Sequence, residues 1–180
     1  ARSNGSSAFV GHALWLDGLD VHVPMAGDFD GDGVDDIGGL RSDNALFGTA
    51  RVALSDRTEF GAPGDWAGGV PFDANTDVLV ADFTGTGPDD VGLVAAGGAL
   101  WVLPSGGTSF EWDIQNGVWQ RRIRSSGQVC RPGNFNRDLN ADIATFVSGG
   151  NDGDVKVSLT GGHASRLAVD LSQFGFGNMT

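Results

Sequence analysis

The sequence predicts an all-β fold built from a repeated unit, and three observations lead to it. Thirty of the 180 residues are glycine, well above the usual share of about 7%, and they lack the Gly-X-Y period of collagen. No stretch shows the sustained 3.6-residue apolar period of a long helix. An acidic motif also recurs three times at nearly constant spacing, and repeats of this length are typical of propeller blades.

The acidic motif sets the register of the repeat. It occupies residues 27–37, 81–91 and 133–143, with its first ligand-type residues 54 and 52 residues apart. A hairpin motif keeps the same register at residues 52–60 and 102–110, and more weakly at 157–165. Phe9 and Trp15 match Phe60 and Trp66, each pair six residues apart. The chain therefore divides into a partial unit, 1–20, and three full units, which we place at 21–72, 73–126 and 127–180.

The middle unit shows the strands that each repeat should contain. Apolar runs cover residues 78–83, 91–96 and 99–103, and a shorter aromatic segment covers 110–112. The acidic motif and two glycine-containing turns separate them, and glycine readily adopts the positive φ that tight turns require. Four short strands in a repeat of about 50 residues are typical of a blade of a β-propeller. We expect four-stranded antiparallel blades, about three and a half in number.

The first acidic loop is the strongest chemical motif in the chain. Carboxylates at positions 1, 3, 5 and 9 of a tight loop, together with the carbonyl oxygen of position 7, can converge on one hard cation. Without a cation, the same carboxylates would repel one another. An EF-hand would require Glu at position 12, where this sequence has Gly39. The predicted Ca²⁺ ligands are Asp28, Asp30, Asp32, the Val34 carbonyl and Asp36.

The second and third acidic loops carry fewer charges. Each keeps two ligand-type carboxylates where the first loop has four, and affinity for calcium follows ligand charge. The predicted weaker sites are Asp82, Thr84, Thr86, the Pro88 carbonyl and Asp90 in one loop, and Asn134, Asn136, Asp138, the Asn140 carbonyl and Asp142 in the other. The alternative is an Asx-type turn without an ion, which we favour for the second loop.

The loop sequence Asp28-Phe-Asp-Gly-Asp-Gly-Val-Asp-Asp-Ile37, with the Val52-Ala-Leu-Ser-Asp hairpin and the Phe60-to-Trp66 strand after it, resembles the FG-GAP/VCBS repeat family of calcium-binding β-propellers. That family includes the integrin α-subunit head, a group of fungal lectins, and accessory domains of secreted bacterial enzymes and toxins. The resemblance implies a propeller with calcium in its strand-connecting loops and an extracellular location, where millimolar calcium fills even modest sites.

Charge and motif content exclude several classes of function. The chain has 11 Lys and Arg against 23 Asp and Glu, a formal charge of −12, which argues against nucleic acid and anionic membrane surfaces as partners. No apolar run reaches the roughly 18 residues of a membrane span. No nucleophile elbow, zinc spacing or phosphate-binding glycine loop occurs, and we interpret the single cysteine, Cys130, as a small buried apolar residue. A carboxylate pair for glycoside hydrolysis stays open.

Two groups of side chains carry alternative interpretations. Trp15 and Trp66 occupy equivalent positions in two units; they either pack between blades or line a pocket where a sugar stacks, as in the lectins that the repeat resembles. Arg121, Arg122 and Arg124 form a small basic cluster in an acidic chain. That cluster is either a solvated loop or a contact for an anion or a partner.

The number of repeats raises the question of closure. Propellers have between about four and eight blades, and an unclosed array exposes strand edges. We expect a second copy, or another chain, to complete the propeller, unless the chain is a piece of a longer protein. The leading functional hypothesis is a secreted, calcium-stabilised, non-catalytic module that binds carbohydrate or a cell-surface ligand. The alternatives are a part of a secreted hydrolase and a structural protein–protein interaction module.

Overall fold

A computed structural model describes residues 2–3, 9–10, 13–113, 117–147, 153–161 and 169–170. These residues form strands, turns and loops, with no helix among them. Three four-stranded antiparallel sheets follow one another along the chain, and a short strand pair, β1 (Arg2–Ser3) with β2 (Phe9–Val10), precedes them. Within the described ranges, no helix offers the length and apolar character needed to cross a membrane.

Each of the three sheets is a simple meander in which every strand pairs with the next one in the sequence. The first sheet contains β3 (Val23–Gly27), β4 (Asp36–Ser42), β5 (Phe47–Ala53) and β6 (Gly64–Pro71). The second contains β7 (Asp77–Ala81), β8 (Asp90–Val94), β9 (Leu100–Leu103) and β10 (Val118–Gln120). The third contains β11 (Val129–Gly133), β12 (Asp142–Phe146), β13 (Val155–Leu159) and β14 (Val169–Asp170).

In every sheet the acidic motif connects the first strand to the second. The residue before each loop pairs with the last residue of the motif's acidic segment, as in Gly27 with Asp36 and Ala81 with Asp90. The predicted all-β fold of antiparallel sheets is therefore confirmed. Closure into a propeller stays a prediction, because the described sheets form an open row.

One predicted strand is wrong. The fourth strand of the middle unit is β10, at residues 118–120, and not residues 110–112. Phe110 instead forms an isolated bridge with Ser105 at the base of the glycine turn. Its buried ring packs edge-on against Phe29 of the first sheet, with centroids 5.5 Å apart. Phe110 therefore joins two sheets rather than extending one.

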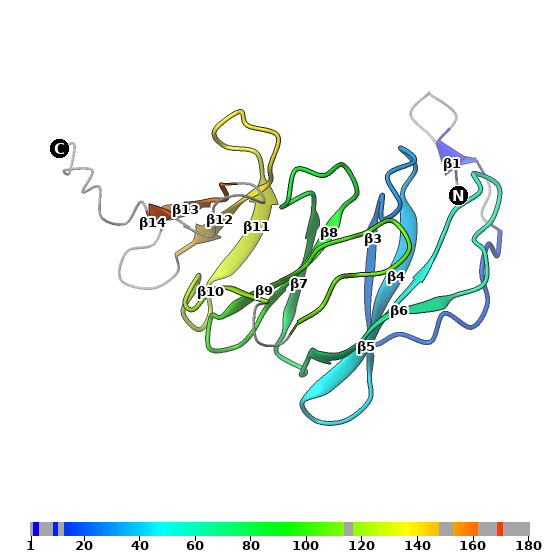
Figure 1. Ribbon diagram of the computed structural model, residues 1–180, viewed down its shortest axis with the longest axis horizontal. Helices are drawn as coiled ribbons and strands as arrows, with labels where there is room; N and C mark the ends of the chain where they lie inside the picture. Colours follow the sequence, from blue (N-terminus) through cyan, green and yellow to red (C-terminus); the bar gives the residue numbers. More distant parts are fainter. Residues whose placement is uncertain are drawn as a thin grey trace.

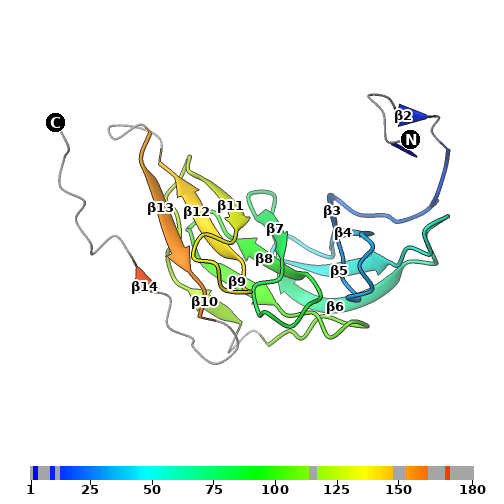
Figure 2. The ribbon, with the colours of Figure 1, turned by 90° about the horizontal axis from the view of Figure 1, so that it is seen from above.

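The sheets lie side by side in chain order, with the first strand of each next to the first strand of its neighbour (Figure 1, Figure 2). Two apolar clusters fill the junctions. The cluster between the first and second sheets includes Met25, Phe29 and Leu93. The cluster between the second and third sheets includes Leu79, Phe83 and Ile143. Alternate residues of the middle strands thus face opposite neighbours, as strand geometry requires.

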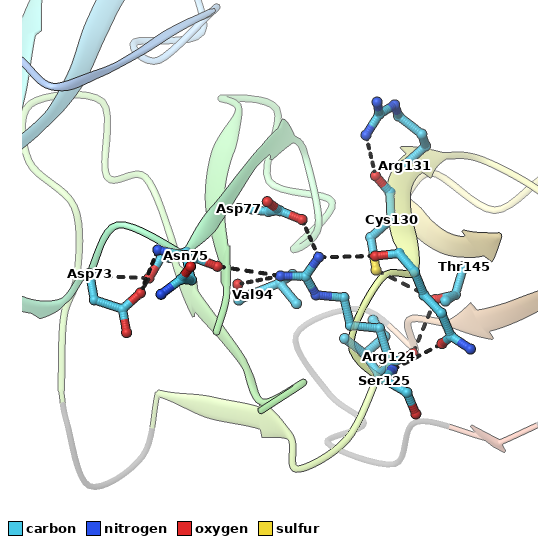
Figure 3. A network of polar contacts seen from close by, with 12 residues as sticks. Asp73, Asn75, Asp77, Val94, Arg124, Ser125, Cys130, Arg131 and Thr145 are labelled. Atoms are coloured by element: carbon cyan, nitrogen blue, oxygen red, sulfur yellow. Dashed lines mark hydrogen bonds and ion pairs between the residues drawn. The ribbon is translucent and has the colours of Figure 1, made fainter. Parts of the chain in front are cut away.

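A buried arginine reinforces the second junction (Figure 3). Arg124, in the segment between β10 and β11, forms an ion pair with Asp77 of β7 and donates hydrogen bonds to the carbonyl oxygens of Val94 and Gln128. Its side chain is only 11% exposed. Interpretation of Arg124 as part of a solvated loop is therefore wrong, because it links the second sheet to the segment that leads into the third.

Cys130 lies beside this network and is 1% exposed. Its sulfur lies 3.5 Å from the Thr145 hydroxyl oxygen. Burial raises the pKa of the Cys130 thiol, which disfavours the nucleophilic thiolate. The structure agrees with a packing role for this cysteine.

Candidate metal site

The acidic loops are equivalent, so we number their nine positions alike. Loop 1 is residues 28–36, loop 2 is 82–90 and loop 3 is 134–142.

The carboxylate at position 1 organises the backbone of loop 1. Asp28 Oδ1 accepts the backbone N–H groups of Gly31 and Asp32 at 2.8 and 3.0 Å, and Oδ2 accepts that of Gly33 at 2.8 Å. Gly31 and Gly33 have φ values of +79° and +83°, which a side chain rarely adopts.

Position 9 anchors loop 1 to the body of the sheet. Asp36 is 2% exposed, and its two carboxylate oxygens accept the N–H of Phe29 at 3.1 Å and that of Ser55 at 2.8 Å. Burial raises the pKa of Asp36, the two N–H donors lower it in part, and the carboxylates of Asp30 and Asp28 raise it further. A cation at the loop would offset both the burial of this charge and the repulsion between the carboxylates.

Three of the four predicted carboxylates converge. One ligand oxygen from each of Asp28, Asp30 and Asp36 lies within 4.8 Å of the other two. The fourth, Asp32, points elsewhere, with Oδ2 lying 3.6 Å from Arg57 Nη2. Val34 follows at position 7, and its N–H donates to Asp32 Oδ1 at 2.8 Å. Loop 1 thus offers a three-carboxylate oxygen cluster, with Asp32 and the Val34 carbonyl next to it in the chain.

Loop 2 keeps the framework of loop 1 without its charge. Asp82 accepts the N–H groups of Gly85, Thr86 and Gly87 at 2.7, 3.1 and 2.9 Å, in the pattern of Asp28. Thr84 and Thr86 replace the carboxylates at positions 3 and 5, and their hydroxyl oxygens lie 2.8 Å apart. Two hydroxyls that satisfy one another can hold the turn without an ion.

The position 9 carboxylate of loop 2 is buried and anchored in the same way as that of loop 1. Asp90 is 0% exposed, and it accepts the N–H groups of Thr84 and Ser105 at 2.9 and 2.8 Å. Burial raises the pKa of Asp90 to about 6, against the opposing effect of these hydrogen bonds. Pro88, the predicted carbonyl ligand at position 7, lies over Gly31 of loop 1, where an added Cβ would be 3.0 Å from the proline Cγ.

Loop 3 departs further from loop 1. Within the described ranges, Asn134 Oδ1 accepts one backbone N–H, that of Arg137 at 2.7 Å, and the Asn134 amide donates to the Asp138 carbonyl. Asn136 and Asp138 bond to one another at 2.8 Å, and the Asn140 N–H donates to Asp138 Oδ1 at 2.9 Å. The candidate ligands of loop 3 therefore bind one another. Its buried Asp142 makes the same two anchoring bonds as Asp36, to Phe135 and Thr160.

The residue at position 8 connects each loop to the preceding loop, and sequence reasoning missed this bridge. The Asp89 N–H donates to the Asp28 carbonyl at 2.7 Å, and Asp89 Oδ2 accepts the Asp28 N–H at 3.0 Å. The Ala141 N–H donates to the Asp82 carbonyl in the same way, at 2.7 Å. Burial raises the pKa of Asp89, and the carboxylates of Asp28, Asp35 and Asp82 add to the effect of burial. The second aspartate next to position 9, as in Asp35-Asp36 and Asp89-Asp90, was the sequence feature that could have indicated this bridge.

The two equivalent tryptophans make equivalent contacts. Trp15 packs on Phe60 with ring centroids 5.5 Å apart, and Trp66 packs on Phe110 at 5.2 Å. The carbonyl oxygens of Trp15 and Trp66 accept the N–H groups of the same phenylalanines at 3.3 and 3.2 Å. Both tryptophans are half-buried, so each has a packing contact and also keeps a solvent-exposed part.

Comparison of the chain with models of known protein families found no match, and comparisons with curated proteins and with solved structures found none either.

Proposed function

We propose that this chain is a secreted, calcium-stabilised binding module of the β-propeller type. The observation that carries the proposal is the convergence of Asp28, Asp30 and Asp36, whose ligand oxygens lie within 4.8 Å of one another. Six hydrogen bonds from backbone N–H groups fix these three carboxylates before any ion arrives. Such a preformed cluster of like charges favours cation binding.

The chemistry of the donors fits calcium. All candidate ligands are oxygens, and calcium accepts six to eight of them in flexible geometry, whereas magnesium requires strict octahedral geometry and retains waters. Asp28, Asp30 and Asp36 would hold the ion, and Asp32 with the Val34 carbonyl would complete the set. Bound calcium would supply two positive charges that neutralise the loop and fix the turn between β3 and β4.

The same chemistry supports the proposed secreted location. Extracellular modules bind calcium with dissociation constants near 10⁻⁴–10⁻³ M, in balance with millimolar calcium outside cells. A three-carboxylate site on an exposed turn fits that class.

We place the carbohydrate or cell-surface ligand at the partly exposed faces of Trp15 and Trp66. Aromatic rings with one packed face and one wet face suit amphipathic ligands such as sugars. Packing on Phe60 and Phe110 supports each ring in a fixed orientation.

A structural protein–protein module is the second candidate, and a different observation favours it. Val129, Phe146 and Val155 pair across three strands of the third sheet and are 42%, 47% and 50% exposed. Paired residues lie on one face of a sheet, so these three form an apolar row. A contiguous exposed row of this kind is typical of interaction surfaces.

Calorimetry with Ca²⁺ and Mg²⁺ tests the metal part of the proposal. Calcium should bind to the metal-free chain with one dominant site per chain, and magnesium should bind more weakly. The variant Asp30→Asn, which replaces one of the three converging carboxylates by an amide, should abolish the dominant site. Equal binding in the variant would contradict the assignment to loop 1.

A glycan array with a parallel hydrolase assay tests the ligand. Saturable binding that Trp15→Ala and Trp66→Ala both weaken, without turnover, supports the lectin-type function. Turnover without saturable sugar binding would favour the hydrolase alternative. Absence of both would favour the protein–protein module.

A further inference from the structure

The third sheet exposes a face that its two predecessors bury. We call the side of a sheet covered by the next sheet its trailing face, and the side that contacts the preceding sheet its leading face. The phenylalanine at loop position 2 reports on the trailing face. Phe29 and Phe83 are 0% exposed because the following sheet covers them, whereas Phe135 is 52% exposed. The trailing face of the third sheet thus lacks cover among the described residues.

The observed junctions show what such a face accepts. At the first junction, Gly27 precedes loop 1 and faces Asp89 of loop 2. A Cβ at Gly27 would lie 2.5 Å from Val80 Cγ1 and 2.7 Å from Asp89 Oδ2, so glycine leaves room for the close approach of both side chains. At the second junction the equivalent residues are Ala81 and Ala141, with the same backbone bond between the loops. A glycine therefore faces an aspartate, and an alanine faces an alanine.

The two outer faces of the chain match the first of these pairings. Gly133 precedes loop 3 on the trailing face of the third sheet, and Asp35 occupies position 8 on the leading face of the first sheet. Asp35 is exposed, and its carboxylate accepts no hydrogen bond from the described part of the chain. Gly133 and Asp35 are the same residue types at the same two positions as Gly27 and Asp89. The Phe135 ring, whose Cζ lies 2.9 Å from a Cβ built at Gly133, has to turn away for Asp35 to enter.

Two further contacts repeat the match. Ser105 Oγ donates to the Phe29 carbonyl at 2.6 Å, and it accepts the Gly107 N–H. The equivalent Ser55 Oγ accepts the Arg57 N–H at 3.1 Å, but its hydroxyl has no acceptor within the ranges that the structure describes. Phe29 also packs on Phe110, and the equivalents of these rings are Phe135 and the half-buried Phe60.

We propose that the trailing face of the third sheet binds the leading face of the first sheet in a second copy of this chain. In this contact the Asp35 carboxylate lies over Gly133 and accepts the Asn134 N–H. The Ser55 hydroxyl donates to the Phe135 carbonyl, and the Phe135 ring packs on Phe60. This inference rests on the propeller-type architecture of the proposed function. Each copy carries one outer trailing face and one outer leading face. Two copies related by a two-fold axis therefore form the contact twice, and the ring closes.

The charges of the two faces are complementary. Loop 3 carries Arg137 at position 4, where loops 1 and 2 carry Gly31 and Gly85. Those glycines lie under position 7 of the following loop, so Arg137 would meet loop 1 of the second copy near Val34. Loop 1 is strongly acidic, and the guanidinium supplies the opposite charge. The larger side chain requires that Val34 sit slightly farther out than Pro88 does over Gly31.

Sedimentation velocity in calcium buffer tests the proposal with one variant on each face. Gly133→Leu fills the space proposed for Asp35, which the Phe135 ring borders in the single chain, and Asp35→Lys reverses the charge of the other partner. Each should raise the dimer dissociation constant at least about tenfold, the loss expected for a charged hydrogen bond. Gly97→Leu and Glu111→Lys make matched changes at exposed residues in the connecting segments of the second sheet, and they should leave the dimer intact. A wild-type chain that stays monomeric, or variants that associate normally, would overturn the proposal.

Mixing the two variants identifies the geometry. A mixed dimer of Gly133→Leu and Asp35→Lys keeps one intact junction, so the mixture should associate more strongly than either variant alone. No recovery would overturn head-to-tail contact. The double variant Gly133→Ala with Asp35→Ala recreates the Ala81–Ala141 pairing, and it should associate more tightly than Gly133→Ala alone.

Calcium titration of the same samples separates this inference from the proposed function. A monomeric chain that binds calcium overturns the docking surface and leaves the metal site in place. A dimeric chain without calcium binding overturns the metal site and retains the docking surface.

Discussion

Replacement of Asp28 by asparagine, compared with the same change at Asp82, separates a metal ligand from a turn residue. Both carboxylates accept three backbone N–H groups at 2.7 to 3.1 Å. An amide nitrogen cannot accept a hydrogen bond, so at least one N–H is left unpaired in each variant. In chelator, each variant should therefore lose about 1–3 kcal/mol of unfolding free energy. Asp28→Asn should lie at the lower end, because it also relieves repulsion among the three carboxylates of loop 1.

Calcium should distinguish the two variants. A ligand at 100 times its dissociation constant stabilises the folded chain by about 2.7 kcal/mol. We expect that increment for the wild type and for Asp82→Asn, and almost none for Asp28→Asn. Urea unfolding followed by tryptophan fluorescence, in calcium and in chelator, measures all six free energies. Equal calcium increments in the two variants would refute the assignment of the ion to loop 1.

Three further predictions concern stability without calcium. Burial raises the pKa of Asp90 from 3.8 to about 6, so between these values the folded state binds more protons than the unfolded state. The free energy of unfolding should therefore fall as pH rises through that window, by up to ~3 kcal/mol; urea titrations in chelator that show a flat or rising profile would contradict this. Arg124→Met removes the ion pair with Asp77 and three hydrogen bonds to carbonyl oxygens. Thermal unfolding should show that the variant loses about 2–3 kcal/mol of unfolding free energy. An unchanged unfolding midpoint would mean that Arg124 does not stabilise the second junction. Phe83→Ala should cost about 3–5 kcal/mol, while Phe135→Ala, at the same loop position but exposed, should cost under ~1 kcal/mol in the monomer; equal losses would mean that the exposed ring is packed in solution.

Local sequence features predicted most of the strands. Residues 78–83, 91–96 and 99–103 correspond to β7, β8 and β9, because apolar runs bounded by turn residues report directly on short buried strands. The sequence does not predict β10 because this strand is only three residues long. The aromatic Phe110 instead favours a strand at residues 110–112. Its aromatic character reflects packing on Phe29 of another sheet, which a local pattern cannot distinguish from strand propensity.

The candidate site shows the same division. Spacing alone predicted the convergence of Asp28, Asp30 and Asp36, since one short loop contains all three. The ion pair of Asp32 with Arg57 depends on a hairpin more than twenty residues away, so the loop pattern does not report it. The bridge from Asp89 to Asp28 spans 61 residues, and it becomes visible only when two sheets are placed side by side. Arg124 is a further case, because its ion-pair partner Asp77 lies 47 residues earlier.

A crystal structure of the chain grown with calcium, with anomalous difference density, tests the central claim most directly. We predict one strong peak in loop 1, at 2.3–2.6 Å from carboxylate oxygens of Asp28, Asp30 and Asp36. Density in loop 1 that fits only water, in a crystal containing millimolar calcium, would contradict the account of this loop as a metal site.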